Sequence, residues 1–324
     1  VLATTVDGWS AGEVKATLAT RPDGRYDVRY GTGDRSEARF VAALLAAGEV
    51  LDTGDYGAWR RVHDDPVAAA RALRRWPGDA FALQRLDADT LYLRLPSFHD
   101  AHAATVRALV ESHAAELART PQLVIDVRGN GGGSDFVYEP LLPLLCTRPI
   151  YRIGVELRAS PVNARLRREV AGRLQATAPE AARVLSESSA RMEAASTPFV
   201  PGVPHPFRIV GCDAPAANPA RVAVLIDRAA SSAENFLLDA RQSRKVVLMG
   251  QQNSTGTIDF GEMMGLAAPS GRFQLLWATS RSLRLPADPV DPHGLAPDVR
   301  IPAEVADPVA HAAQALGGAS RPAP

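Results

Sequence analysis

The sequence predicts a mixed α/β (α+β) protein in which β-sheets are flanked by helices. Three observations support this fold class. Residues 81–98 alternate between apolar and polar side chains as strands do, and an apolar run at 121–128 leads into a glycine cluster. Residues 221–250 then follow the order strand, helix, strand. This order predicts a βαβ unit with parallel strands and a right-handed crossover.

Composition limits the classes of function. The chain has 324 residues, 46% of them hydrophobic, which is enough for one large domain or two ordinary ones. The formal net charge is zero and no dense run of lysine or arginine occurs, so we expect no nucleic-acid partner. No apolar run is long enough to span a membrane. The chain begins at Val1 within a strand-like stretch, so we expect that it is cut or processed upstream.

The two cysteines, Cys146 and Cys212, do not have the spacing of a zinc site. We expect neither a metal nor a cofactor. The cysteines could form one disulfide in an oxidising compartment, or they could remain two buried thiols. The sequence leaves both possibilities open.

Residues 1–80 are expected to form an N-terminal accessory lobe. This segment contains two strand-like runs and two helical stretches, the last of which ends at Trp76-Pro77-Gly78. In chain order these elements fall at residues 1–6, 26–30, 36–50 and 66–75.

Residues 81–303 are expected to form the main domain. It should begin with a hairpin over 81–98 and a long helix over 101–117 whose apolar residues lie on one face. The Arg/Glu- and Ala-rich stretch at 164–195 has helical periodicity and predicts an inserted helical arm or lid. The remaining residues, 304–324, are rich in Ala, Pro and Gly, and we expect a flexible tail there.

A glycine cluster follows the strand that ends at Arg128, and its backbone amides are not covered by side chains. Phosphate-binding motifs fit it poorly, because Ser134 stands where GxGxxG needs its third glycine and no GK[ST] follows. An oxyanion hole requires only a bare turn of this kind. Many glycine clusters after strands are plain turns, so this signal is weak when taken alone. The cluster comprises Gly129, Gly131, Gly132 and Gly133.

Ser231 and Ser232 lie where the strand 221–227 passes into a helix. With Glu234 they form the S-x-x-E pattern of a capping box, which is a purely structural explanation. A serine nucleophile at the same place would gain from the helix dipole and from the amide that follows it, because both favour an oxyanion. The two interpretations are compatible.

These two segments together resemble the tail-specific (C-terminal processing) proteases, a family of serine peptidases. The family carries an R-x-N-x-G-G turn after a strand and an S-A-x-E motif at a helix start. The corresponding stretches here are VIDVRGNGGG and SSAE, accompanied in the expected order by LYLRLPSF, KVVLMGQQNSTGTID and GLAPDV. The resemblance covers residues 81–302. It implies curved β-sheets with flanking helices, related to the Clp protease and crotonase folds.

The resemblance also assigns roles by position. Ser231 falls on the nucleophile, and Gly131 or Gly132 with the Ser232 amide falls on the oxyanion hole. Family members commonly pair the serine with a lysine in a T-x-G-K-type loop, but this chain has Ser254-Thr255-Gly256-Thr257 there. Lys245 is expected to face solvent at the entry of a strand. The chain therefore resembles the branch without that lysine, which includes the tricorn-core-like and interphotoreceptor retinoid-binding-protein-like members.

The general base is the open question. In the tricorn-like enzymes a histidine from an upstream helical segment acts with a carboxylate, whose position here is held by Asp291. Within the chain, His99 and His293 are candidate bases, and either could instead be an ordinary polar loop residue. Thr255 and Thr257 could bind substrate or only shape their turn. Arg94, Arg128 and Asp126 are expected to be paired structural charges, and Asp298 is also expected to be structural.

The sequence therefore predicts a serine peptidase that acts on protein or peptide substrates. The resemblance implies a periplasmic or secreted location. A non-catalytic peptide- or ligand-binding protein on the same fold is the main alternative. A crotonase-like acyl-CoA enzyme is a third possibility, but it would not need a nucleophilic serine, and the neutral charge would attract CoA phosphates weakly.

Overall fold

A computed structural model describes residues 16–20, 26–30, 50–51, 80–202, 205–212, 215–267 and 274–318. The chain divides into two compact units. The unit that contains the predicted site, called the core unit below, is built from Trp76–Glu156, Pro201–Gly261 and Arg281–Pro324. The second unit contains Leu157–Val200 and Glu262–Ser280 together with the strands before residue 76. The helices and strands confirm the mixed α/β class, with sheets flanked by helices.

A six-stranded sheet of order β17-β12-β11-β6-β5-β4 forms the centre of the core unit. Strands β4 and β5, which come first in the chain among these six, pair antiparallel and confirm the hairpin predicted over 81–98. Neighbouring strands from β5 to β17 pair in parallel. The strands are β4 (Ala82–Arg85), β5 (Thr90–Arg94), β6 (Gln122–Asp126), β11 (Arg221–Leu225), β12 (Val246–Gly250) and β17 (Val299–Arg300).

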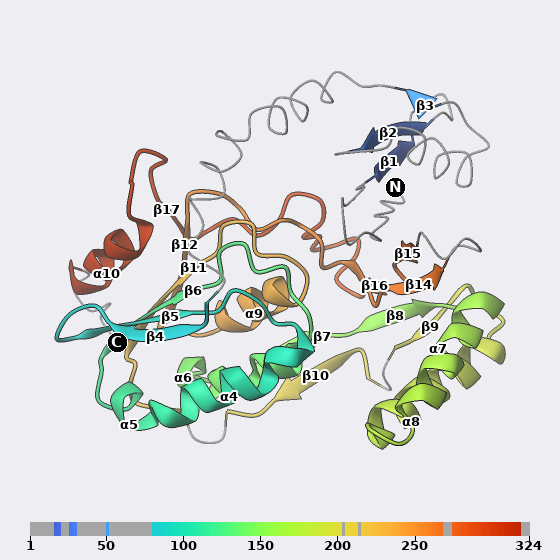
Figure 1. The fold of residues 1–324 in the computed structure, drawn as a ribbon, viewed down its shortest axis with the longest axis horizontal. Helices are drawn as coiled ribbons and strands as arrows, with labels where there is room; N and C mark the ends of the chain where they lie inside the picture. The colour runs from blue at the N-terminus through green and yellow to red at the C-terminus, as the bar shows by residue number, and fades with distance from the viewer. Residues whose placement is uncertain are drawn as a thin grey trace. The chain divides into compact units, whose positions relative to one another are not determined.

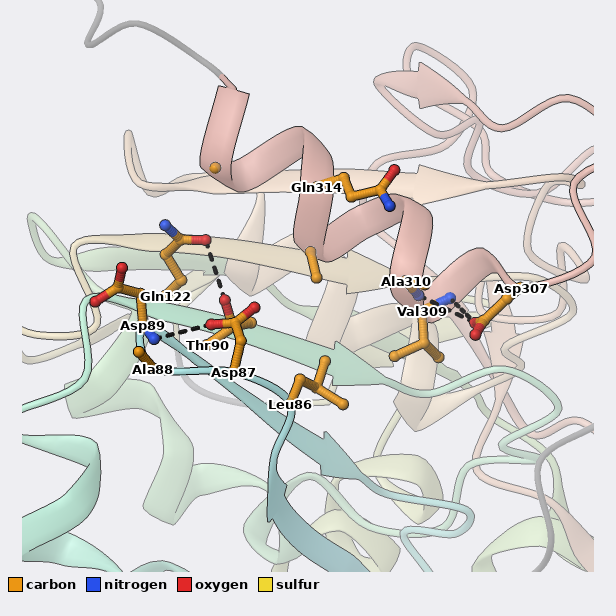
Figure 2. A pocket seen from close by; sticks show the side chains of 12 residues that line it. Leu86, Asp87, Ala88, Asp89, Thr90, Gln122, Asp307, Val309, Ala310 and Gln314 are labelled. Atoms are coloured by element: carbon orange, nitrogen blue, oxygen red, sulfur yellow. Dashed lines mark hydrogen bonds between the residues drawn. The ribbon is translucent and has the colours of Figure 1, made fainter.

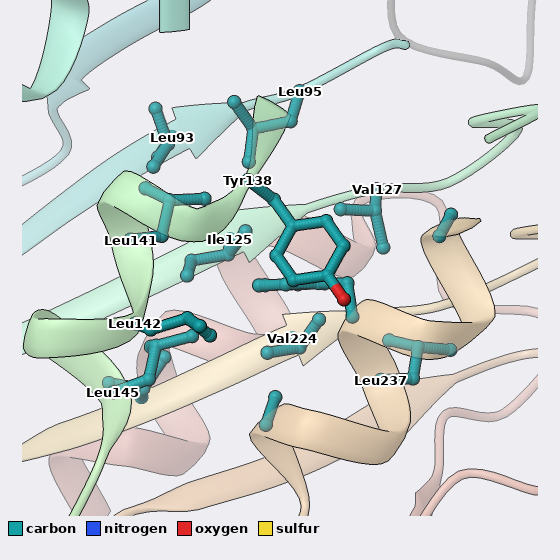
Figure 3. Close-up of a cluster of buried hydrophobic side chains, with 14 of the residues drawn as sticks. Leu93, Leu95, Ile125, Val127, Tyr138, Leu141, Leu142, Leu145, Val224 and Leu237 are labelled. Atoms are coloured by element: carbon teal, nitrogen blue, oxygen red, sulfur yellow. The ribbon is translucent and has the colours of Figure 1, made fainter. Parts of the chain in front are cut away.

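One face of this sheet packs against the larger hydrophobic core (Figure 3). Alternate strand residues such as Leu93, Ile125 and Val224 point into it and are fully buried. The covering helices are α4 (Ala103–Ser112), α6 (Leu142–Leu145) and α9 (Ser232–Ala240). Helix α9 lies between β11 and β12 in the chain, and those strands are parallel, so the predicted βαβ unit is confirmed.

The other face of the sheet is covered by α10 (Pro308–Gly318), which Figure 1 shows on the opposite side from α4 and α6. The expectation of a flexible tail over 304–324 is therefore wrong for residues 308–318. The physical reason is that Ala312 and Leu316 recur on one helix face and are buried against the sheet residues Tyr92, Val124 and Leu225. Residues beyond 318 lie outside the described part.

One other helical prediction needs correction in detail. The helix expected over 101–117 is divided at His113 into α4 and α5 (Ala114–Leu117) and is preceded by η1 (Asp100–His102). A ring nitrogen of His113 lies 2.9 Å from the Leu109 carbonyl oxygen, which α4 would otherwise bond to an amide. After the glycine cluster the chain forms η2 (Asp135–Val137), η3 (Glu139–Leu141) and then α6.

The remaining strands of the core unit include a two-stranded antiparallel pair, β7 (Ile150–Ile153) and β10 (Phe207–Val210). Cys146 precedes this pair, Cys212 follows it, and the two are joined in a disulfide with Cα atoms 6.0 Å apart. Strand β13 (Phe260–Gly261) also belongs to this unit. The chain passes between the units within β8 (Val155–Arg158), β9 (Phe199–Pro201) and β16 (Ser280–Ser282).

In the second unit, the predicted helical insertion consists of α7 (Pro161–Leu174) and α8 (Pro179–Glu193), which pack against each other. The strands β14 (Met264–Ala267) and β15 (Gln274–Trp277) form a hairpin. A small sheet contains β1 (Ala16–Thr20), β2 (Tyr26–Tyr30) and β3 (Val50–Leu51). The second of these confirms the strand predicted at 26–30. The elements predicted at 1–6, 36–50 (apart from Val50) and 66–75 lie outside the described residues.

None of the described helices combines the length and apolar character needed to cross a bilayer.

Candidate active site

The predicted site residues lie at one edge of the six-stranded sheet. Because β6, β11 and β12 are parallel, the segments that follow them emerge at the same edge. The glycine turn follows β6, Ser231 follows β11, and the loop with Thr255 and Thr257 follows β12. Crevices outside the carboxyl ends of parallel strands are the usual ligand sites of open α/β sheets.

The glycine turn packs directly against the serine turn. A Cβ atom added at Gly132 would lie 2.8 Å from Ser231 Cβ, 2.8 Å from the Ser232 amide nitrogen and 2.7 Å from the Ala230 carbonyl oxygen. Gly132 also has φ +88°, which favours glycine. The close approach of residues about a hundred positions apart therefore depends on the missing side chain at residue 132.

Asn130, a residue that sequence reasoning did not single out, organises the glycine turn. It is fully buried, its Oδ1 accepts a hydrogen bond from the Gly132 N–H at 2.8 Å, and its Nδ2 donates to the Leu95 carbonyl at 3.0 Å. Its own carbonyl accepts from the Ala230 N–H at 2.9 Å. A polar side chain buried in this way needs all of these partners, and the R-x-N-x-G-G pattern was the available signal.

Ser231 has φ 54° and ψ −124° at the N-terminal boundary of α9. A positive φ is uncommon outside glycine and costs on the order of 1–3 kcal/mol. A strained strand-to-helix turn is also the geometry that presents the serine of a nucleophile elbow. The neighbouring Ser232 hydroxyl donates to the Gly133 carbonyl at 2.7 Å, which fastens the helix start to the glycine turn.

Glu234 holds the site together more extensively than a helix cap would. Its carboxylate is fully buried and accepts hydrogen bonds from the Ser231 N–H at 3.2 Å and the Thr257 N–H at 2.8 Å. It also accepts from the Gly256 N–H at 2.7 Å and the Ser254 hydroxyl at 2.5 Å. Ser254 Oγ in turn accepts from the Leu295 N–H. One carboxylate therefore joins the serine turn, the loop after β12 and the GLAPD segment.

The amides differ in their availability for an oxyanion. The Gly132 N–H is already donated to Asn130. Within the described part of the chain, the Gly131 and Ser232 amides donate no backbone hydrogen bond, and a Cβ at Gly131 would meet nothing within 4 Å. Of the two glycines expected at the oxyanion hole, Gly131 therefore has the free donor, and Gly132 allows the close approach.

The two threonines contact the serine turn. Thr257 Oγ1 accepts from the Ser231 N–H at 3.2 Å and donates to Glu234. Thr255 donates from its N–H to the Ala229 carbonyl and from its hydroxyl to the Arg228 carbonyl. Both side chains therefore shape the turn, and Thr257 stands at the position where the sequence resemblance leads one to expect a lysine.

Neither candidate histidine is hydrogen-bonded to Ser231 in the described residues. His99 is the N-cap of η1, and its Nδ1 accepts from the Ala101 N–H at 3.3 Å. Its backbone abuts the glycine turn, because a Cβ at Gly133 would lie 2.5 Å from the His99 nitrogen. His293 is exposed, and its carbonyl accepts from the Asn253 side chain.

Asp291 Oδ1 accepts from the Ile258 and Asp259 amides at 2.7 and 3.0 Å. These bonds anchor the segment before GLAPD to residues 258–259, which follow the threonine loop.

Lys245 directly precedes β12, at the opposite end of that strand from the candidate site, and the strand between them is roughly 13 Å long. Contrary to the expectation that it faces solvent, it is half-buried, its Nζ donates to the Ala216 carbonyl at 3.0 Å, and burial lowers its pKa. The reason is the loop before β11, which covers it.

The charges beside the site are paired, as expected. The fully buried Asp126 accepts two hydrogen bonds from the Arg128 guanidinium, at 2.9 and 2.7 Å, and one from the Tyr92 hydroxyl. Arg94 donates to its carbonyl. Burial and the neighbouring Asp126 raise the pKa of Tyr92. Asp298 Oδ2 accepts from the Leu248 N–H, which agrees with a structural role.

A pocket of about 540 Å³ lies at the other edge of the sheet (Figure 2). The turn between β4 and β5, the start of β6 and helix α10 line it. It contains three aspartates, of which Asp87 and Asp307 accept hydrogen bonds from nearby backbone amides. None of the predicted site residues belongs to it.

Comparison with known proteins gives a family match and a fold match. The profile of peptidase family S41 matches residues 89–301, which is well over half of the chain. A comparison with curated proteins gives no significant match. A solved structure of a CPAF mutant is similar with a TM-score of 0.51 at 14% identity, over 96% of this chain and 70% of that one.

Two further solved structures are similar with lower scores. The photosystem II D1 C-terminal processing protease has a TM-score of 0.41 at 17% identity, over 75% of this chain and 50% of that one. A lipoprotein from Streptococcus agalactiae has a TM-score of 0.44 at 12% identity, over 88% and 83%. The chain spans 59%, 50% and 63% of the first three structures it matches. The family match covers the glycine turn, the serine turn and the GLAPD segment together, and the chain belongs to peptidase family S41.

Proposed function

We propose that the chain is a serine peptidase that hydrolyses peptide bonds through an acyl-enzyme on Ser231. The observation that carries this proposal is the contact between the glycine turn and the serine turn. This contact brings Ser231, a strained serine at a helix start, close to the backbone amides of the glycine turn. We infer that a substrate carbonyl group fits between them. An acyl-transfer site needs this combination of nucleophile and preorganised donors.

In the proposed reaction, Ser231 Oγ attacks the carbonyl carbon of the scissile bond as a base removes its proton. The amides of Ser232 and Gly131 donate to the oxyanion, and the N-terminus of α9 adds a favourable dipole. The proton then passes to the departing amine, and the carbon–nitrogen bond breaks. Water hydrolyses the resulting ester and restores the hydroxyl.

The identity of the base is part of the proposal. His99 must release its cap on Ala101 before Nδ1 can accept a proton from serine, whereas Nε2 carries the proton while that cap is made. Among the described residues, none is hydrogen-bonded to the His293 ring or to Asp291 Oδ2, because the bonds to Asp291 use Oδ1. We propose that Oδ2 orients a histidine, either His293 or one supplied from upstream residues. Replacing each histidine by glutamine and comparing acylation rates against pH would separate these possibilities.

We propose protein or peptide substrates and a periplasmic or secreted location. The disulfide between Cys146 and Cys212 supports such a location, because disulfides persist in oxidising compartments.

A fluorophosphonate probe tests the nucleophile directly. We expect the protein to be labelled at Ser231, as identified by peptide mass analysis, and the Ser231→Ala variant to remain unlabelled. The Ser232→Ala variant keeps both the nucleophile and its amide and should still be labelled, although more slowly, because it loses the bond to Gly133. Absence of labelling in a folded protein would contradict the proposal.

A non-catalytic peptide-binding protein is the second candidate. It is favoured by Thr257 in the lysine position and by the absence, among the described residues, of a histidine bonded to Ser231. In that case Ser231→Ala should leave peptide binding and cellular function unchanged.

A further inference from the structure

The pair of strands β7 and β10 carries an exposed apolar face. The antiparallel register places Ile153 opposite Phe207 and Tyr151 opposite Ile209. These four side chains are 48%, 50%, 54% and 53% exposed, respectively. Because directly opposed residues point to the same side of a sheet, the four form one contiguous surface. Contiguous exposed apolar surface marks a site of interaction.

One edge of this pair is closed by a side chain. Gln242 Oε1 accepts from the Tyr151 N–H at 2.9 Å, and Gln242 Nε2 donates to the Tyr151 carbonyl at 3.0 Å. Both backbone groups of Tyr151 therefore point away from β10. In an antiparallel ladder, opposed residues exchange either both hydrogen bonds or neither. Ile209, opposite Tyr151, must accordingly point its N–H and carbonyl away from β7.

The other edge is open. The same alternation directs the N–H and carbonyl of Phe207 outward, and the bond from the Gly154 N–H to the Pro206 carbonyl at 2.8 Å fits this register. No described strand pairs with this edge, and no described residue bonds to the outward groups of Phe207 or Ile209. An unblocked edge with apolar side chains is a template for another strand.

We propose that the outer edge of β10 is an exosite at which an extended segment of a polypeptide substrate adds a third strand. The assignment of the occupant as substrate rests on the proposed peptidase function. Helix α9 runs about 15 Å from the serine turn toward Gln242 at about 1.5 Å per residue, which reaches the closed edge of the pair. A strand docked on the open edge of β10 lies two strand spacings, about 10 Å, beyond β7, so the exosite is on the order of 25 Å from Ser231. About seven or eight extended residues span that distance. The docked segment therefore lies outside the scissile bond.

Arg208 defines the chemistry of the docked strand. It lies between Phe207 and Ile209 on the opposite face of the sheet, is 62% exposed, and has Glu139 Oε1 at 3.6 Å. Within the pair, Arg208 already lies opposite Arg152 of β7, and both arginines have Glu139 Oε1 as their nearby carboxylate. A second copy paired symmetrically about Arg208 would add a further arginine directly opposite it, which is destabilising. A strand with an acidic residue between two apolar ones matches both faces. The edge is therefore better suited to a different peptide than to a second copy.

The test uses the full chain with Ser231→Ala, so that docking is measured without cleavage. The probe is a fluorescein-labelled peptide in which valine and glutamate alternate, and its binding is measured by fluorescence anisotropy. Ile209→Pro removes one outward N–H and none of the bonds to β7. We expect it to weaken binding about tenfold or more, and Phe207→Asp to do the same. Leu86→Asp, at an exposed apolar residue in another part of the core unit, is the control and should leave the affinity for the peptide unchanged.

Unchanged affinity in Ile209→Pro and Phe207→Asp, or no binding to the parent, would overturn the exosite. So would conversion of a dimer to a monomer by Ile209→Pro in sedimentation, because the occupant would then be a second copy. If the protein with Ser231 intact is not labelled by the fluorophosphonate probe while the Ser231→Ala variant still binds the peptide, the peptidase function is contradicted. The proposed docking edge is then still supported.

Discussion

At the scale of single residues, the site depends on conformations that side chains normally oppose. Gly132 lacks the Cβ that would collide with residues 230–232, and Ser231 accepts a positive φ that glycine would adopt more easily. Strain of this kind persists only where the surroundings enforce it. Here the Asn130 carbonyl and the Ser232 hydroxyl bond across the contact, to the Ala230 N–H and the Gly133 carbonyl, and Glu234 ties the serine turn to the loop after β12.

Gly132→Ala should therefore abolish fluorophosphonate labelling and reduce the free energy of unfolding by about 1–3 kcal/mol. The matched control is Gly131→Ala, because a Cβ there meets no atom within 4 Å and its backbone is not in the left-handed region. Chemical denaturation should find the control close to the parent. A Gly132→Ala variant that is as stable and as readily labelled as the parent would show that the turns do not need to touch.

Glu234→Gln should slow labelling and lower stability by about 1–3 kcal/mol, because an amide NH₂ would replace one of two oxygens that face only donors. Denaturation midpoints and labelling rates measure the two effects. Glu116→Gln, at a partly exposed carboxylate paired with Arg85, is the control and should stay within about 0.5 kcal/mol of the parent.

Asp227 should make stability depend on pH. Burial raises its pKa above the ordinary 3.8, so the folded protein binds a proton that the unfolded chain has already lost. The free energy of unfolding then falls as the pH rises through the interval from 3.8 to the raised value. Asp227→Asn keeps the oxygen that accepts from the Gln252 N–H and should remove this fall. Parallel stability curves for parent and variant over that interval would contradict the assignment.

At the scale of elements, the disulfide brackets everything between α6 and the end of β10. The two cysteines are 66 residues apart in sequence. Cross-linking a loop of that length lowers the entropy of the unfolded chain and so raises its free energy by about 4 kcal/mol. Cys146→Ala with Cys212→Ala should lower the free energy of unfolding by up to this amount. A reductant should destabilise the parent in urea and leave the double variant unchanged.

At the scale of the whole molecule, the six-stranded sheet needs a cover on both faces. Its central strands are buried on both sides, and α10 supplies the second cover. Leu316→Ala should cost about 2–4 kcal/mol in denaturation experiments, because it leaves a cavity against the sheet. Gln314→Ala, on the exposed side of the same helix, should stay within about 0.5 kcal/mol.

Local pattern alone determined much of this protein. The alternation over 81–98, the glycine cluster and the strand-helix-strand order over 221–250 predicted the hairpin, the turn after β6 and the βαβ unit, because such features depend on neighbouring residues. The R-x-N-x-G-G and S-x-x-E patterns also identified the two turns of the candidate site.

Only the tertiary structure decided which groups meet. The contact of Gly132 with Ser231, the junction made by Glu234 and the pairing of Cys146 with Cys212 join segments distant in sequence. The burial of α10 and the open edge of β10 likewise depend on packing against strands far away in the chain. No local periodicity encodes such contacts, because they are set by sheet order and by how much apolar surface each face still has to bury.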